Sequence, residues 1–219
     1  MSVVISVANL KGGVGKSTMT IFLASAFGSN GKKVLVLDAD RQHTIKSIWQ
    51  LEDDPDKQPL FDLEVIAPRY IYDLLKIKAD KYDLVFIDVP RSTEDKTDTS
   101  VASLITLCDA VLIPVVPSQL DVLSTIEFLK MIKEIETWKI DHDLDFRVAA
   151  FLNRSSKRNE SAFAKDALKG YDLDFLDADL PDLKMFLYPS AFSSILDTKA
   201  GQGKFERFYN EVQGLIAGL

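Results

Sequence analysis

A glycine-rich segment near the start of the chain sets the strongest constraint on its fold. Gly12, Gly13 and Gly15 stand between an apolar run at Val3–Ala8 and a segment with helical spacing at Thr18–Ser29. Glycine tolerates left-handed backbone conformations, so a tight loop here lets successive N–H groups turn inward around an anion. The start of the following helix adds unpaired N–H groups and the positive end of its dipole. The sequence therefore predicts a strand, a phosphate-binding loop and a helix, in that order.

Short apolar runs alternate with helical patterns along the rest of the chain. The runs are continuous rather than alternating in polarity, which is typical of strands covered on both faces of a parallel sheet. This repetition predicts an α/β fold with a doubly wound, mostly parallel sheet and helices on both faces. No linker rich in Gly, Ser or Pro divides the chain, so we expect residues 1–219 to form a single domain. The other expected strands are Val34–Leu37, Leu84–Ile87, Ala110–Val116 and Val148–Leu152, and the other expected helices are Ile71–Ala79 and Val122–Trp138.

The composition excludes several classes of protein. A single cysteine, Cys108, rules out a disulfide framework or a four-thiolate metal site made by this chain alone. The formal net charge is −7, so any binding of nucleic acid must come from a local basic patch. The longest apolar run, at 110–116, is too short to span a bilayer, and no targeting signal is evident. We therefore expect a cytoplasmic protein.

Two side chains that follow the glycines carry the chemistry expected of the loop. Lys16 is placed to reach the β- and γ-phosphates of a nucleotide, and the hydroxyl of Ser17 is placed to bind Mg²⁺. The standard phosphate-loop pattern also requires a glycine five residues before Gly15, where Leu10 stands. A glycine-rich turn without a ligand is the alternative, but Gly-Lys-Ser-Thr directly after an apolar strand favours a nucleotide site.

Lys11 completes a more specific pattern. Residues 11–18 read Lys-Gly-Gly-Val-Gly-Lys-Ser-Thr, which resembles the deviant Walker A motif of the ParA/MinD family of ATPases. The resemblance extends from Val3 to about Arg154 and implies a Mg²⁺-dependent ATPase with ATP and Mg²⁺ as cofactors. It also implies that Lys11 reaches the partner's phosphates across the interface of an ATP-dependent homodimer; a solvated loop cation is the alternative. The residues that the resemblance assigns to nucleotide binding are Gly12, Gly13, Val14, Gly15, Lys16, Ser17 and Thr18, with Lys11 and Lys16 also acting in catalysis.

Three carboxylates stand at the ends of expected strands, where α/β sheets bind ligands. Asp38 and Asp40 lie in a segment similar to the family's Asp-x-Asp-Pro-Gln, and Asp88 ends a run that resembles Walker B. By this match Asp40 positions the attacking water, Asp38 holds Mg²⁺ through a bound water, and Asp88 supports the Mg²⁺ site from behind its direct ligands. A capping carboxylate for Asp38 and an ordinary strand-ending carboxylate for Asp88 are the alternatives.

Three more positions are defined by the resemblance. Asn153 follows the run at 148–152 and matches an asparagine that hydrogen-bonds the adenine edge in the family; a turn asparagine is the alternative. Arg41 stands where the family usually has proline, and Arg91 follows Pro90 where the family usually has a further proline or alanine.

The cargo of such an ATPase is less constrained, and a ParA-type partition or positioning ATPase is the first interpretation. Its ATP dimer binds DNA non-specifically, and a ParB-like or other small activator protein stimulates hydrolysis. Residues 147–169 carry six basic against two acidic side chains, and 199–207 add three more basic ones, so we expect these two patches to bind DNA. A solvated helix face is the alternative. The protein would then position a plasmid, chromosome or other cargo and associate with the nucleoid when ATP is bound. Since the chain opens with the first strand, we expect no N-terminal helix-turn-helix domain.

A MinD-like membrane ATPase is the second interpretation. It requires a basic amphipathic terminal helix, whereas residues 205–219 hold one basic and two acidic side chains. We therefore expect this segment to dock on the body through Phe208, Val212 and Leu215, without stable membrane association. A metabolic relative that carries an iron–sulfur cluster needs two cluster cysteines per subunit, and Cys108 alone is expected to be a core residue.

Overall fold

Seven strands form one sheet in a computed structural model that describes residues 2–52, 56–90, 101–155, 158–182, 184–199 and 201–219. The strand order is β3-β2-β4-β1-β5-β6-β7, and every pairing within the described residues is parallel. The five expected strands are confirmed to within about one residue at most ends. The strands are β1 (Val3–Val7), β2 (Val34–Asp38), β3 (Asp62–Val65), β4 (Leu84–Asp88), β5 (Ala110–Val115), β6 (Arg147–Ser155) and β7 (Leu180–Pro181).

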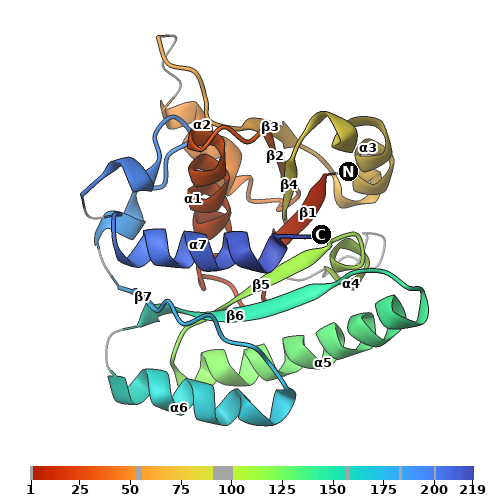
Figure 1. Cartoon of the computed structure of the whole chain (residues 1–219), viewed down its shortest axis with the longest axis vertical. Helices are drawn as coiled ribbons and strands as arrows, with labels where there is room; N and C mark the ends of the chain where they lie inside the picture. Colours follow the sequence, from red (N-terminus) through yellow and green to blue (C-terminus); the bar gives the residue numbers. More distant parts are fainter. Residues whose placement is uncertain (1, 53–55, 91–100, 156–157, 183, 200) are drawn as a thin grey trace.

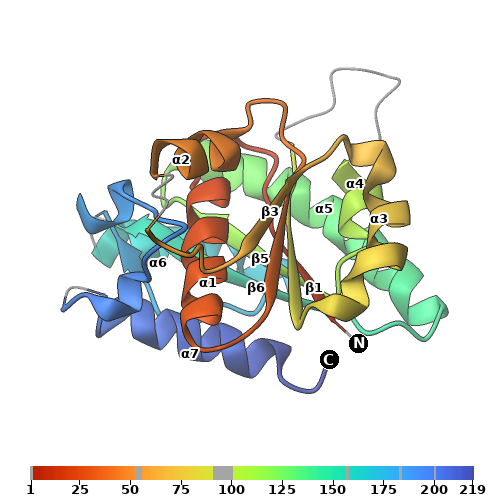
Figure 2. The same ribbon diagram turned by 90° about the horizontal axis from the view of Figure 1, so that it is seen from above.

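Helices cover both faces of the sheet (Figures 1 and 2). One hydrophobic cluster joins a face of the sheet to α1, α2 and α7, and a second joins the opposite face to α3, α4, α5 and α6. The doubly wound α/β prediction is therefore confirmed, whereas the assignment of 1–219 to a single domain stays a prediction. The helices are α1 (Lys16–Ser29), α2 (Thr44–Glu52), α3 (Ile71–Lys78), α4 (Val101–Ile105), α5 (Gln119–Asp141), α6 (Arg158–Leu168) and α7 (Lys204–Ile216).

The last helix, α7, is a core element. Phe208 and Val212 are fully buried, and Leu215 packs against the same cluster, as expected from the sequence. The ring of Tyr209 lies 4.8 Å from that of Phe27 on α1, between centroids, so α7 covers the helix that follows the glycine loop. Among the described residues, no helix has both the length and the apolar character needed to cross a membrane.

Cys108 lies just after α4 and is completely buried, which confirms it as a core residue. Its thiol donates to the carbonyl oxygen of Leu104 at 3.5 Å. Burial raises the pKa of the Cys108 thiol far above its ordinary value, so this sulfur stays protonated and unreactive in the folded chain.

Candidate functional site

The glycine loop, residues 8–15, joins the carboxyl end of β1 to α1 at the centre of the sheet. Gly13 and Gly15 have φ values of +81° and +99°, a region that side chains with a Cβ rarely adopt. A Cβ on Gly15 would also lie 2.4 Å from Nδ2 of Asn153. Within the described residues no side chain caps α1, and its first turn holds no acid, so its N–H groups and positive dipole end are left for an anion.

Lys16 is the first residue of α1 and is nearly buried. Its ammonium donates to the carbonyl oxygen of Lys11 at 3.0 Å, which folds the side chain back over the loop. An ammonium has three donors, so it can bind phosphate oxygens as well as a carbonyl oxygen. The structure therefore places the ammonium of Lys16, the expected phosphate-binding lysine, against the glycine loop.

Two buried carboxylates face each other beside the loop. Asp38 at the end of β2 and Asp88 at the end of β4 are directly paired in the sheet register and have no solvent exposure. The hydroxyl of Ser17 donates to Oδ2 of Asp88 at 2.7 Å, and the backbone N–H of Lys46 donates to Oδ2 of Asp38 at 3.1 Å. The other oxygen of each carboxylate, Oδ1, has no hydrogen-bond partner among the described residues.

Burial shifts the ionisation of both groups. It raises the pKa of Asp88 to about 7. The hydrogen bond from Ser17 acts to lower this pKa, and the nearby carboxylate of Asp38 acts in the same direction as burial. Burial likewise raises the pKa of Asp38 above its ordinary value. Two orphaned carboxylate oxygens next to a serine hydroxyl are a donor set that suits a hard divalent cation such as Mg²⁺. The residues present therefore fit the metal site that the sequence predicts.

Asp40 lies in the loop that connects β2 to α2. It is nearly buried, and its Oδ1 accepts from the backbone N–H of Gln42 at 3.0 Å. The neighbouring Arg41 is exposed, while Arg91 lies outside the described residues. The role of Asp40 in positioning water stays a prediction.

Asn153 lies at the end of β6 and is bound to the glycine loop. Its Nδ2 donates to the carbonyl oxygen of Val14 at 2.8 Å, and its Oδ1 accepts from the N–H of Arg154 at 3.1 Å. Both ends of the amide thus hold backbone in this structure, and Gly15 is what allows the close approach. Contact with adenine stays a prediction, and the structure adds a role in holding the loop.

Three residues without a role in the sequence analysis join the site. Asn9 donates through Nδ2 to the carbonyl of Pro114 at 3.1 Å and to Oγ1 of Thr125 at 3.0 Å, and so pins the start of the loop to β5 and α5. Nδ1 of His43 lies 3.9 Å from Oδ1 of Asp38.

Asp121 is the third of these residues, and it forms an ion pair with Lys11. Its Oδ1 lies 2.6 Å from Nζ of Lys11. A Ser-x-x-Asp capping pattern before α5 is the local signal that could have identified it.

Several cations of the two expected basic patches are already bound to groups within the molecule. Arg147 donates to the carbonyl oxygen of Leu215 at 2.8 Å, and Lys165 lies 3.5 Å from a carboxylate oxygen of Asp179. Arg207 is exposed but pairs with Asp177 and Glu211. Lys157 and the side chain of Arg158 lie outside the described part of the structure. The other exposed cations of these patches are Arg154, Lys169, Lys199 and Lys204.

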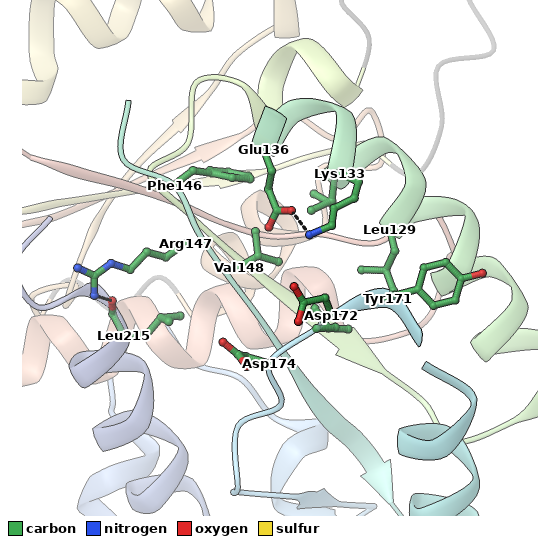
Figure 3. A pocket seen from close by; sticks show the side chains of 12 residues that line it. Leu129, Lys133, Glu136, Phe146, Arg147, Val148, Tyr171, Asp172, Asp174 and Leu215 are labelled. Atoms are coloured by element: carbon green, nitrogen blue, oxygen red, sulfur yellow. Dashed lines mark hydrogen bonds and ion pairs between the residues drawn. The ribbon is translucent and has the colours of Figure 1, made fainter. Parts of the chain in front are cut away.

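A separate cavity of about 270 Å³ lies near the start of β6, at the edge of the sheet opposite to the glycine loop. Figure 3 shows the side chains that line it. It is lined by Phe146–Val148 at the start of β6, by residues 171–174 and by the second half of α5, where Lys133 and Glu136 form an ion pair at 2.9 Å. Parallel strands all begin at the same edge, so this cavity is remote from the strand ends that carry the glycine loop. Sheets of this type bind ligands at the carboxyl ends of the strands, which favours the loop as the functional site.

Comparison with known proteins matches residues 5–185 to the model of the CobQ/CobB/MinD/ParA nucleotide binding domain. The chain belongs to this family. It is 31% identical over 131 residues to the maintenance of carboxysome distribution protein A of Halothiobacillus neapolitanus, covering 59% of this chain and 57% of that protein. The chain thus spans a little over half the length of the curated relatives it matches.

Solved structures share the family fold along most of the chain. Apo McdA from Cyanothece superposes with a TM-score of 0.72 at 19% identity, over 98% of this chain and 99% of that one. Cobyrinic acid a,c-diamide synthase from Mycobacterium smegmatis, with a bound ATP analogue and magnesium, superposes with a TM-score of 0.65 at 22% identity, over 84% and 88%. That protein binds an ATP analogue and magnesium on this fold. In the present chain, the residues that could hold such ligands are the glycine loop and the cluster of Ser17, Asp38 and Asp88.

Proposed function

We propose that the chain is a Mg²⁺-dependent ATPase of the ParA type that switches between a monomer and an ATP-bound sandwich dimer. The observation that carries the proposal is the cluster of Ser17 with the two orphaned carboxylates of Asp38 and Asp88 beside the glycine loop. Phosphoryl transfer depends mostly on positioning and on neutralising charge, and this cluster supplies a metal site where both are needed.

The chain's own residues divide the work. The loop N–H groups and the end of α1 bind phosphate oxygens, and Lys16 adds a charged donor to the β- and γ-phosphates. Mg²⁺, when bound, neutralises charge on the phosphates. Asp40 holds the attacking water, and its nearly buried position keeps competing solvent away. Lys11 completes the partner's phosphate site in the dimer.

Phosphate release measures the proposed activity directly. We expect slow hydrolysis that requires Mg²⁺ and is abolished by EDTA. Lys16→Ala should lose nucleotide binding or turnover, whereas Asp40→Ala should bind ATP, dimerise and fail to hydrolyse it. Hydrolysis at the wild-type rate by Asp40→Ala would remove that residue from the mechanism.

The cargo is proposed from the family and from the name of a curated relative. A protein that maintains carboxysome distribution matches more than half of this chain, which supports positioning of a cellular body, a plasmid or a chromosome. We propose that the ATP dimer associates with the nucleoid through non-specific DNA contacts in the cytoplasm and that a small ParB-like activator protein releases it. Among the described residues of the two patches, the exposed cations Arg154, Lys169, Lys199 and Lys204 are available for phosphate contacts.

Salt dependence tests the DNA proposal. The Asp40→Ala dimer with ATP should be retained on duplexes of random sequence at low salt and released as salt rises. Lys204→Ala removes one cation from each subunit, so it should make the slope of log affinity against log salt shallower by about one for each phosphate that this lysine neutralises. No retention at low salt would remove DNA from the proposal, and binding to anionic vesicles instead would favour the MinD-like alternative.

A further inference from the structure

An ion pair between Lys11 and Asp121 connects the glycine loop to the first turn of α5 within one subunit. Nζ of Lys11 lies 2.6 Å from Oδ1 of Asp121, with side chains that are 34% and 14% exposed. Asp121 lies in the first turn of α5, which is 110 residues further along the chain. The lysine that the family resemblance assigns to a partner's phosphates is therefore bound within its own subunit in the structure.

Asp121 is held in place by contacts that do not involve Lys11. Ser118 caps α5 by accepting from the N–H of Asp121 at 3.2 Å, and its hydroxyl donates to Oδ2 of the same residue. This reciprocal arrangement resembles a capping box and leaves Oδ1 for the lysine. The N-terminal end of the α5 dipole also stabilises the carboxylate, so Asp121 remains in a favourable place when Lys11 leaves.

The backbone of Lys11 is held against the same helix. The N–H of Lys11 donates to Oδ1 of Asn9 at 3.2 Å, and Nδ2 of Asn9 donates to Oγ1 of Thr125 on α5 at 3.0 Å. Asn9 and Thr125 are buried. The backbone of Lys11 is therefore anchored, and rotation of its side chain is enough to open the ion pair.

We propose that Asp121 is a latch that holds Lys11 in the monomer and sets how much nucleotide is needed for dimerisation. The proposal rests on the proposed function, because Lys11 must leave Asp121 to reach the phosphates of a second copy of this chain. A lysine side chain that extends to the second subunit cannot keep its Nζ against Asp121 of its own subunit, so the two contacts compete. When only a fraction of the monomers has Lys11 released from Asp121, the apparent affinity for a second subunit falls in proportion to that fraction.

The size of the effect follows from the exposure of the pair. Partly exposed ion pairs change an equilibrium by about 1.7- to 5.5-fold each, and a sandwich dimer breaks two of them. Removing the latch should therefore tighten dimerisation by about 3- to 30-fold. High salt should reduce the difference, because it screens the pair in the monomer.

Sedimentation velocity of the full chain with Mg²⁺ and AMPPNP measures this effect. Asp121→Asn removes the charge and keeps a partner for the Ser118 hydroxyl, and Asp121→Ser is a second variant in case the first folds poorly. Glu127→Gln removes an exposed charge from the same helix and is the matched control. We expect the Asp121 variants to dimerise at about 3- to 30-fold lower protein concentration than the wild type and Glu127→Gln, and we expect no such gain in a Lys11→Ala background.

A second measurement needs no dimer. Acetic anhydride labelling of the nucleotide-free protein, read by mass spectrometry, should modify Lys11 faster in Asp121→Asn than in the wild type or in Glu127→Gln. Unchanged or weaker dimerisation by the Asp121 variants would overturn the latch while leaving the proposed ATPase intact. If all variants bind AMPPNP and none dimerises, the sandwich dimer of the proposed function fails and the latch fails with it.

Discussion

At the scale of single residues, the site depends on positions where one chemical group cannot be exchanged for another. Gly15 combines a left-handed backbone with a close approach to Asn153, and Asp88 is a carboxylate with no solvent exposure. The sequence shows only the residue types at these two positions, a glycine and an aspartate. The reasons for both features are tertiary, because the neighbours that impose them lie on β6 and β2.

Gly15→Ala should disrupt the loop. The added Cβ would meet Nδ2 of Asn153 at 2.4 Å on a backbone with φ of +99°, so either the loop or Asn153 must move. We expect a loss of about 1–3 kcal/mol in the free energy of unfolding and a fall of at least about tenfold in nucleotide affinity. Gly214→Ala on α7 is the control, since its Cβ meets nothing within 4 Å of the described residues, and it should be neutral or stabilise by up to about 1 kcal/mol. Denaturant melts and isothermal titration with ATP check both.

Asp88→Asn should stabilise the metal-free protein in a pH-dependent way. Burial raises the pKa of Asp88 to about 7, so the folded chain keeps a proton that the unfolded chain releases near pH 4. The stability of the wild type relative to the variant should therefore fall as pH rises from about 4 to about 7 and stay level above it. Between pH 5.5 and pH 8 this amounts to about 2 kcal/mol. Urea melts in EDTA measure it, and Asp166→Asn, which changes an exposed acid, should show no comparable trend.

At the scale of elements, the sequence predicted those with a strong local signal and missed those without one. Continuous apolar runs predicted five strands because such runs need cover on both faces. β3 was missed because Asp62–Val65 carries two acids and is half-exposed, whereas the short strand or turn expected within residues 171–182 is β7. Helix α2 was missed because it buries a single residue, Ile45.

Phe208→Ala tests α7 as part of the core. The ring is fully buried and lies 4.7 Å from that of Phe151 on β6, between centroids. Removing it should lower the free energy of unfolding by about 3–5 kcal/mol. Phe163→Ala is a matched control because that ring on α6 is 44% exposed, and its effect should be well below half as large. Equal losses from the two changes would contradict the placement of α7 in the core.

At the scale of the whole molecule, the order of the strands assembles the site. All described pairings are parallel, so the carboxyl ends of β1, β2, β4, β5 and β6 meet at one edge and deliver the glycine loop, Asp38, Asp88, Asp121 and Asn153 respectively. The start of α5, which carries Asp121, also has two exposed apolar side chains: Leu120 and Leu123. We expect this end of α5 to meet the second subunit in the proposed sandwich dimer.

Leu123→Glu should therefore weaken the dimer without harming the monomer. Leu123 follows Asp121 by two residues on α5 and is 60% exposed, so a carboxylate there is tolerated in the monomer and would be desolvated in the proposed interface. We expect at least about tenfold weaker dimerisation with AMPPNP and unchanged nucleotide binding by the monomer. Ile140→Glu changes an exposed side chain at the far end of the same helix and should leave dimerisation at the wild-type level. Light scattering measures both variants, and equal behaviour would place the interface elsewhere.

The sequence by itself determined the strand, glycine loop and helix, the buried strands and the residue types of a phosphate and metal site. These follow from local backbone freedom and from the polarity of neighbouring side chains, which a linear pattern records. Only the tertiary structure decided that Asp38 and Asp88 share a register position, that Asn153 holds Val14, and that Lys11 meets Asp121. Those contacts depend on the order of strands in the sheet, which brings together residues up to 139 positions apart and leaves no trace in any local pattern.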